Sequence, residues 1–247
     1  MPVSVSIVET VGLRWCSLRT QFYDLLFPPR CIGCGRVGTL LCVECLDQLP
    51  RVDSSCCPRC GDAVVVEGLC VRCRTSPLHI ERIRSVMVFE GVLREAVHQL
   101  KYRGRTALAA PLGGLMAAYW TRHSMPRHLM PPDVLVPVPL HAARQRARGY
   151  NQAALLACEM GRRVGLPVDE QTLIRQRTTA PQVDLNARER QENVRDAFCC
   201  SGNGLVGKRV LLIDDVCTTG ATMEACAVAL TEGGVRSVQA LTLARAR

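Results

Sequence analysis

The sequence predicts an α/β fold, in which a parallel sheet is flanked by helices and preceded by a small four-cysteine zinc-ribbon module. Cysteine pairs crowd the first 73 residues, and from about Ile83 onward short apolar runs alternate with longer helical patterns. The 247 residues, 48% of them apolar, suffice for one medium domain and a small accessory module. We expect an amino-terminal helix at 1–28, the zinc module at 29–76 and the α/β domain at 83–247.

Eight cysteines form four pairs, with two residues between the members of each pair. The pairs are Cys31 and Cys34, Cys42 and Cys45, Cys57 and Cys60, and Cys70 and Cys73. Two thiolates at this spacing bind one ion from a tight turn, and two pairs complete a tetrahedral shell with no open position for a catalytic water. We predict two structural zinc ions, each held by two consecutive pairs, that take no part in chemistry. An interleaved arrangement, first pair with third, is the alternative.

Disulfide bonds are the competing account of these cysteines. The first residues lack a secretory signal, so we expect a cytoplasmic protein, in which thiols stay reduced. No stretch of about 18 apolar residues is present, so membrane insertion is not expected. The zinc module carries little apolar bulk, and metal binding would supply its folding free energy.

The α/β part is predicted to alternate strands with helices. Strands are expected at 86–89, 134–139, 209–213 and 235–243, and helices at 92–101, 108–120, 152–164 and 221–232. Asn151 is placed to cap the helix at 152–164, which ends at Gly165. The polar stretch 175–195 has weak periodicity and predicts a long loop of a functional or mobile kind.

A ligand site is predicted where the strand at 209–213 meets the following helix. Parallel sheets bind ligands at their carboxyl edge, and Asp214 and Asp215 leave the strand there. A loop of hydroxyl residues around Gly220 then opens a helix, whose first N–H groups attract anions. This pattern suits a phosphate monoester, with the two acids near the vicinal hydroxyls of an attached ribose. A capped turn without a ligand is the alternative, but paired acids at a buried edge are costly without a partner.

The net charge of +9, from 31 Lys and Arg against 22 Asp and Glu, favours an anionic partner. Phosphate metabolites and nucleic acids both qualify, and a basic surface that serves only solubility is the alternative. Aromatic residues make up only 4% of the chain, which argues against stacking platforms for single-stranded nucleic acid.

The stretch 210–222 resembles the phosphoribosyl-pyrophosphate (PRPP) motif of class I phosphoribosyltransferases. Val136-Pro137-Val138-Pro139 resembles the pyrophosphate loop of amidophosphoribosyltransferases, and Arg177-Thr178 with Pro181-Gln182 resembles their flexible catalytic loop. Together with the cysteine pairs and the stretches 148–152 and 193–195, the chain is similar to the ComF family, which is associated with bacterial DNA uptake. The likeness extends from about Phe27 to Arg245.

The resemblance implies binding of PRPP with Mg²⁺. It assigns Asp214 and Asp215 to the ribose hydroxyls, and Arg177 to a segment that closes over the site. The turn at Pro139, Leu140 and His141 would offer backbone amides to the pyrophosphate and its Mg²⁺. The residues implied for the 5-phosphate form one loop: Thr218, Thr219, Gly220, Ala221 and Thr222.

Two functions follow from the resemblance. In the first, the protein is a phosphoribosyltransferase with an unidentified acceptor, whose task is positioning and charge neutralisation. Arg144, Arg146 and Arg148 are candidates for neutralisation, or else a solvated basic stripe, and Lys101 and Arg103 match a recurrent family block. In the second, the PRPP site is a sensor, and the protein handles single-stranded DNA or docks on proteins of the DNA-uptake machinery.

Overall fold

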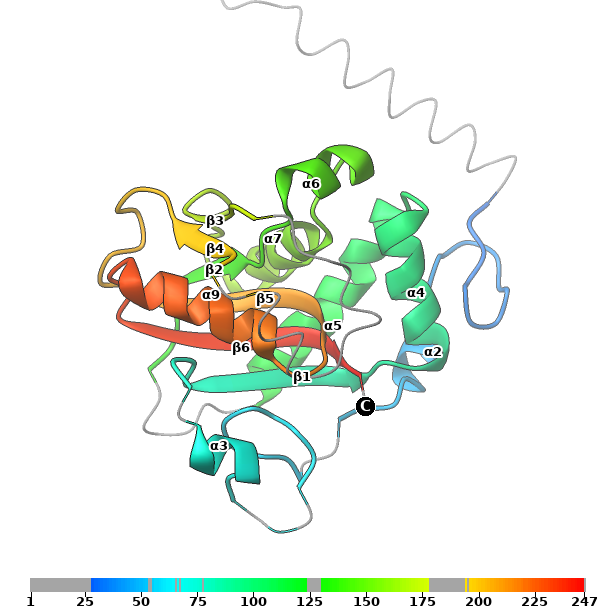
Figure 1. Ribbon diagram of the computed structural model, residues 1–247. Coiled ribbons are helices and arrows are strands. Elements are labelled where there is room, and N and C mark those ends of the chain that lie inside the picture. Colours follow the sequence, from blue (N-terminus) through cyan, green and yellow to red (C-terminus); the bar gives the residue numbers. More distant parts are fainter. Residues whose placement is uncertain are drawn as a thin grey trace, which may run out of the picture. The chain divides into compact units, whose positions relative to one another are not determined.

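The computed structural model describes residues 28–52, 55–64, 66, 68–76, 78–123, 130–177, 194 and 196–246 (Figure 1). The helix expected before Pro28 and most of the loop expected at 175–195 lie outside these residues. The chain divides into two compact units, 1–48 and 49–247, so the two cysteine quartets belong to different units. The domain boundaries expected from the sequence stay a prediction.

The first unit contains one short helix, α2 (Val43–Asp47), in its described part. Cys42 directly precedes this helix, and an isolated bridge between Arg30 and Val37 closes the preceding turn. The N–H of Gly35 donates to the carbonyl of Cys31 at 2.8 Å, which folds the first cysteine pair into a tight turn. Gly35 has a φ of 75°, a conformation that glycine adopts without strain.

The second unit is built on a four-stranded sheet in the order β1 (Arg82–Val88), β6 (Ser237–Arg245), β5 (Arg209–Cys217) and β2 (Val134–Pro137). All neighbouring strands run parallel, as the sequence predicts. The strands are nearly continuous apolar runs because both faces of a parallel sheet are covered by helices.

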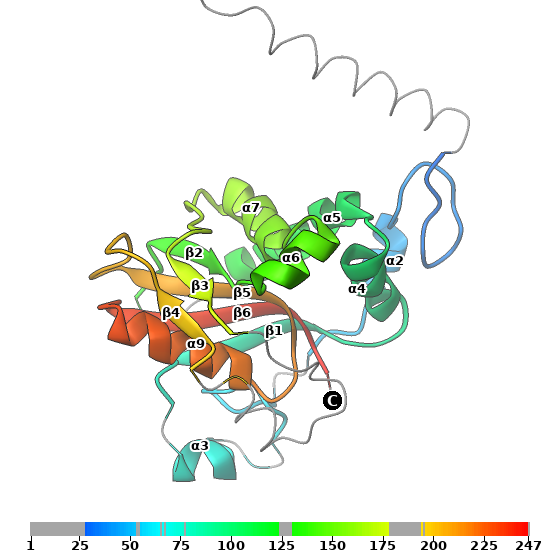
Figure 2. The ribbon, with the colours of Figure 1, turned by 45° about the horizontal axis from the view of Figure 1, so that its top comes forward.

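Helices cover the two faces of this sheet (Figures 1 and 2). The helices α5 (Ala109–Arg122) and α7 (Gln152–Val164) pack on one face, and α9 (Ala221–Glu232) packs on the other. The helix α4 (Gly91–Tyr102) follows β1. The close contact of α5 and α7 requires Gly113, since a Cβ there would lie 2.6 Å from the Cβ of Glu159.

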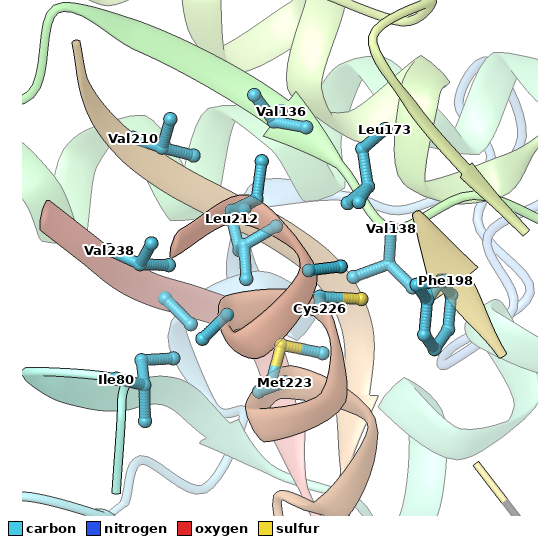
Figure 3. Packing of buried hydrophobic residues seen from close by; sticks show 14 of the residues in the cluster. Ile80, Val136, Val138, Leu173, Phe198, Val210, Leu212, Met223, Cys226 and Val238 are labelled. Atoms are coloured by element: carbon cyan, nitrogen blue, oxygen red, sulfur yellow. The ribbon is translucent and has the colours of Figure 1, made fainter. Parts of the chain in front are cut away.

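One apolar cluster lies between α9 and the sheet, and Figure 3 shows its packing. An antiparallel hairpin of β3 (Leu173–Arg175) and β4 (Phe198–Cys200) adds side chains to this cluster. The members labelled in the figure are Ile80, Val136, Val138, Leu173, Phe198, Val210, Leu212, Met223, Cys226 and Val238. This burial fixes α9, and with it the loop that precedes α9.

The helices 152–164 and 221–232 have the bounds that the sequence predicts. Asn151 caps the first of them, because its Oδ1 accepts a hydrogen bond from the N–H of Ala153 at 3.0 Å, and Gly165 ends it with a φ of 73°. The prediction that β5 ends at Ile213 was wrong. Its ladder with β6 continues to Cys217, so Asp214 and Asp215 lie on the strand rather than beyond it.

The hairpin β3–β4 and the helices α3 (Val71–Thr75) and α6 (Ala142–Arg148) were not predicted. Each is seven residues or shorter, and segments of this length carry too few apolar positions to show a period. Of the helices in the described residues, none is both long and apolar enough to cross a membrane.

Candidate functional site

The carboxyl ends of β2 and β5 lie side by side. The two strands are paired in parallel, with Pro137 opposite Ile213, and the N–H of Val138 donates to the carbonyl of Ile213 at 2.9 Å. The turn Pro139–His141 therefore begins next to Asp214, the first of the paired acids. Two segments that are distant in the sequence are thus joined at the edge where open α/β folds bind ligands.

Asp215 points to the face of the sheet on which Lys101 lies. Its side chain is buried, and its Oδ2 is 2.5 Å from the Nζ of Lys101, in the last turn of α4. Burial opposes ionisation of both groups, but their mutual attraction outweighs it. The pKa of Lys101 is accordingly raised and the pKa of Asp215 is lowered. The short contact and the two pKa shifts both favour an ionised carboxylate paired with an ammonium group.

Asp214 behaves differently from its neighbour because successive residues of a strand point to opposite faces. Its side chain is partly exposed, and its Oδ1 accepts a hydrogen bond from the N–H of Asp215 at 2.8 Å. Burial raises the pKa of Asp214 well above its usual value, and the charge of Asp215 adds to the shift. A carboxylate in this position gains from a ligand that brings hydroxyl donors or a cation.

The loop that follows β5 opens α9 through a left-handed glycine. Gly220 has a φ of 80° and precedes the first residue of the helix, Ala221. The hydroxyl of Thr219 accepts a hydrogen bond from the N–H of Ala221 at 3.3 Å. The first N–H groups of a helix have no partner within the helix, and its dipole is positive there. The loop can therefore hold a phosphate group.

The turn after β2 opens a helix as well. His141 precedes α6, and its Nδ1 accepts a hydrogen bond from the N–H of Ala143 at 3.3 Å. The exposed face of α6 carries Arg144 and Arg146. Arg148, at the end of α6, hydrogen-bonds to the side chain of Gln152. The exposure of Arg144 and Arg146 fits both a neutralising role and a solvated basic stripe.

The end of α4, which carries Lys101, is held by the segment after α6. The hydroxyl of Tyr150 donates to the carbonyl of Leu100, and the guanidinium of Arg148 lies 5.3 Å from the centre of the Tyr102 ring. In the sequence, the blocks 100–104 and 148–152 are recognisable only as separate stretches. Their contact depends on tertiary packing, so the ion pair of Lys101 could not be predicted.

Arg177 is exposed and lies two residues beyond the end of β3. Its expected neighbours on a closing segment, Thr178, Pro181 and Gln182, lie outside the described residues. The catalytic role of Arg177 stays a prediction.

The two cysteine quartets are grouped as the sequence favours: Cys31, Cys34, Cys42 and Cys45 in one, and Cys57, Cys60, Cys70 and Cys73 in the other. The interleaved alternative was wrong. The sulfur atoms of each quartet lie within 4.8 Å of one another. Several pairs are 3.6 Å apart, close to the about 3.8 Å that a tetrahedral zinc site requires.

In each quartet one cysteine has a lowered pKa, whereas burial and the neighbouring thiols raise the pKa of two others, Cys42 and Cys45 in the first quartet and Cys60 and Cys73 in the second. Burial favours the neutral thiol, but nearby N–H groups outweigh it and lower the pKa of Cys31 and of Cys57 to about 6 in each case. Thiolates are the form that binds zinc, so the backbone of each turn favours metal binding. Four sulfur ligands leave no coordination position for substrate, which fits two structural zinc ribbons.

Metal analysis of the protein purified under reducing conditions should give about two zinc ions per chain. Replacing Cys31 and Cys34 by serine should remove one of them, because each quartet closes its own shell. The exposed Cys158, replaced by serine, is the matched control and should leave both ions bound. A wild-type content near one ion would show that one quartet does not hold zinc.

Lys101→Met should destabilise the protein at neutral pH by about 3 kcal/mol, because it leaves the buried Asp215 without its counter-charge. The loss should shrink on acidification. In the wild type, the pKa of Asp215 is lower in the folded than in the unfolded protein, so its ionisation stabilises the fold at every pH above the unfolded-state pKa. In the variant, burial alone raises the folded-state pKa, so ionisation destabilises the fold and protonation at lower pH relieves the loss. Urea unfolding of the wild type and the variant at about pH 8 and about pH 5.5 measures the loss of stability and its change with pH. The exposed Arg103→Met is the control, and a deficit independent of pH would contradict the assignment.

Two family models match the chain. The model of the double zinc ribbon domain matches residues 22–74, and the model of the phosphoribosyl transferase domain matches residues 148–247. The first range contains both cysteine quartets. The second contains β5, its paired acids and the loop that opens α9.

Three curated relatives span most of the chain. The DNA utilization protein YhgH of Salmonella typhimurium is 36% identical over 206 residues, which cover 83% of this chain and 90% of the relative. Competence protein F of Haemophilus influenzae is 29% identical and covers 88% of this chain and 97% of the relative. Competence protein ComFC of Bacillus subtilis is 28% identical, and the match covers 83% of this chain and 84% of the relative. With this identity over nearly the whole length of its relatives, and with a double zinc ribbon ahead of a phosphoribosyltransferase domain, the chain belongs to the ComF family.

Proposed function

We propose that the chain binds PRPP and transfers its phosphoribosyl group to an acceptor that is still to be identified. One observation carries the proposal: a parallel strand bears Asp214 and Asp215 at its carboxyl end and leads through a glycine turn into the first turn of α9. Anion-binding N–H groups and hydroxyl-binding carboxylates then lie a few residues apart. PRPP presents a phosphate and a ribose diol at a similarly short separation.

Each part of the site has a role in this proposal. The loop of Thr218, Thr219, Gly220, Ala221 and Thr222 binds the 5-phosphate. Asp214 and Asp215 accept hydrogen bonds from the ribose hydroxyls. The turn of Pro139, Leu140 and His141, placed beside Asp214 by the pairing of β2 with β5, offers its amides to the pyrophosphate. Arg177 closes over the bound substrate.

Mg²⁺ would be bound with the substrate at the same edge. The ion prefers oxygen ligands and is usually held by one or two carboxylates together with substrate phosphates. The side chain of Asp214, which is partly exposed and has a raised pKa, is a fitting ligand because a cation would relieve its electrostatic cost. When bound, the ion would neutralise charge on the departing pyrophosphate.

The chain's own cations supply the rest of the charge balance. Lys101 keeps Asp215 ionised, so that its carboxylate accepts hydrogen bonds and does not compete for a proton. The reaction develops positive charge on the ribose and negative charge on the leaving group. Placing an ionised carboxylate near the first and N–H groups near the second lowers the barrier by electrostatic preorganisation.

The names of the relatives connect this chemistry with DNA. Competence and DNA utilization are functions of those proteins, and we extend them to this chain as a cytoplasmic role in the use of incoming DNA. A second candidate function is direct handling of single-stranded DNA, with PRPP as a regulatory ligand. The exposed arginines on α6 and the net charge of +9 favour this alternative over a purely protein-docking role.

Calorimetry with PRPP and Mg²⁺ tests the first function. The wild type should bind PRPP, and Asp214→Asn should weaken binding by about tenfold or more, because an amide cannot replace the carboxyl group as a ligand of Mg²⁺ and as an acceptor for the ribose hydroxyls. Glu232→Gln, at the far end of α9, is the control and should leave the affinity unchanged. Equal affinity in the wild type and Asp214→Asn, or no binding by the wild type, would overturn the proposal.

A salt titration tests the second function. If the protein binds single-stranded DNA through phosphate contacts, the logarithm of the affinity should fall linearly with the logarithm of the salt concentration, with a slope of about −0.7 for each contact. The double variant Arg144→Gln, Arg146→Gln should reduce that slope, while Arg122→Gln, at the end of α5, should not. Undetectable binding at low salt would exclude direct DNA handling.

A further inference from the structure

The second cysteine quartet contacts the loop assigned to the phosphate. Arg72 lies between the ligands Cys70 and Cys73 on α3, and its guanidinium donates to the carbonyl of Thr219 at 2.5 Å. The two residues are 147 positions apart in the sequence but belong to the same compact unit. A metal-binding turn and a ligand-binding loop are therefore joined by a charged hydrogen bond.

The quartet is anchored to the end of β6 by Arg245. This side chain is only 5% exposed, and it donates to the carbonyl of Cys60 at 3.2 Å and to the sulfur of Cys217 at 3.1 Å. Its guanidinium also forms an ion pair with Asp62 at 3.1 Å. Cys217 is the last residue of β5, immediately before the phosphate loop. One arginine thus ties the first cysteine pair of the quartet to the strand that carries the loop.

A second anchor lies at the start of β1. Arg84 donates to the carbonyl of Pro58 at 2.9 Å, and the N–H of Ile83 donates to the carbonyl of Arg59 at 2.7 Å. The turn approaches so closely that a Cβ on Gly61 would lie 2.7 Å from the carbonyl oxygen of Ile83. The metal-binding turn therefore rests directly on the sheet.

The phosphate loop packs against the same residues from the other side. A Cβ on Gly220 would lie 3.0 Å from the Cδ1 of Ile83 and 3.9 Å from a guanidinium nitrogen of Arg72. Glycine is required here for its φ of 80° as well as for this close approach. Ile83 and Arg72 thus both pack against the loop at Gly220.

We propose that the second zinc site positions the phosphate loop through Arg72. A trans peptide bond is planar, and its C=O and N–H point in opposite directions. Because Arg72 holds the carbonyl of Thr219, the N–H of the same peptide, that of Gly220, is turned away from α3. A zinc ion held by Cys57, Cys60, Cys70 and Cys73 would fix α3 and with it Arg72. This inference rests on the proposed binding of PRPP.

Arg72 is a positioning residue in this account, and it contacts no substrate. The zinc ion itself has a closed shell and takes no part in the chemistry, in keeping with four sulfur ligands. Its contribution is to preorganise a donor before the phosphate arrives, so that less ordering is left to occur upon binding. The first quartet lies in the other compact unit and has no role in this proposal.

The test uses the full chain with its metal and compares Arg72→Ala with Arg74→Ala, an exposed neighbour on the same short helix. Arg72→Ala should retain about two zinc ions, show a lower NMR order parameter for the amide of Gly220 without ligand, and bind PRPP about tenfold more weakly. Arg74→Ala should match the wild type in all three. Arg72→Lys should recover part of the affinity, because it keeps the charge without the guanidinium fork.

The order parameter of the Gly220 amide separates this inference from the proposed function. If the wild type fails to bind PRPP, the proposed function fails, but a lower order parameter at Gly220 in Arg72→Ala still supports positioning by Arg72. An unchanged order parameter in that variant overturns the inference whatever the affinity. Should Arg72→Ala lose its zinc, the same comparison is made with Arg72→Met, which keeps the aliphatic part of the side chain but cannot donate to Thr219, and a wild-type order parameter there overturns the inference.

Discussion

The strand β5 pairs in parallel with β2 on one side and with β6 on the other, and this pairing decides where the charged groups of the second unit lie. It brings the turn after β2 beside Asp214, and it places Cys217 next to Arg245 at the end of β6. Both neighbouring strands are buried and largely apolar, so their burial offsets the free-energy cost of placing two acids on β5. A change of register by one residue would exchange the faces of Asp214 and Asp215 and separate the second from its ammonium partner.

The two acids show how one strand can give neighbouring carboxyl groups different properties. Asp215 faces Lys101 and is ionised, whereas Asp214 faces the opposite side, where burial and the charge of Asp215 raise its pKa. The alternation of a strand is enough to produce this difference. A bound cation would thus interact mainly with Asp214, because Asp215 already has an ammonium partner in the protein.

The sequence was sufficient for those features that depend on local pattern. The parallel sheet, the caps of the helix 152–164, the bounds of α9 and the grouping of the cysteines all follow from spacing and from residues such as Asn151 and Gly165. The extent of β5 was misjudged because two acids normally end a strand, and only the partner β6 keeps the ladder going. Lys101 and Arg72 meet their partners across more than 100 residues, and no local pattern encodes such contacts.

The buried guanidinium of Arg245 bears on how far this protein is modular. Two of its acceptors, the carbonyl of Cys60 and the carboxylate of Asp62, belong to the cysteine-rich stretch, although the arginine is the last residue of the sheet. A fragment that started at β1 would leave the buried guanidinium of Arg245 without these two acceptors. An unpaired buried charge strongly lowers the free energy of unfolding. The natural point of division is therefore the boundary at 48 and 49, between the two ribbons, and a transplanted α/β part would have to carry the second ribbon with it.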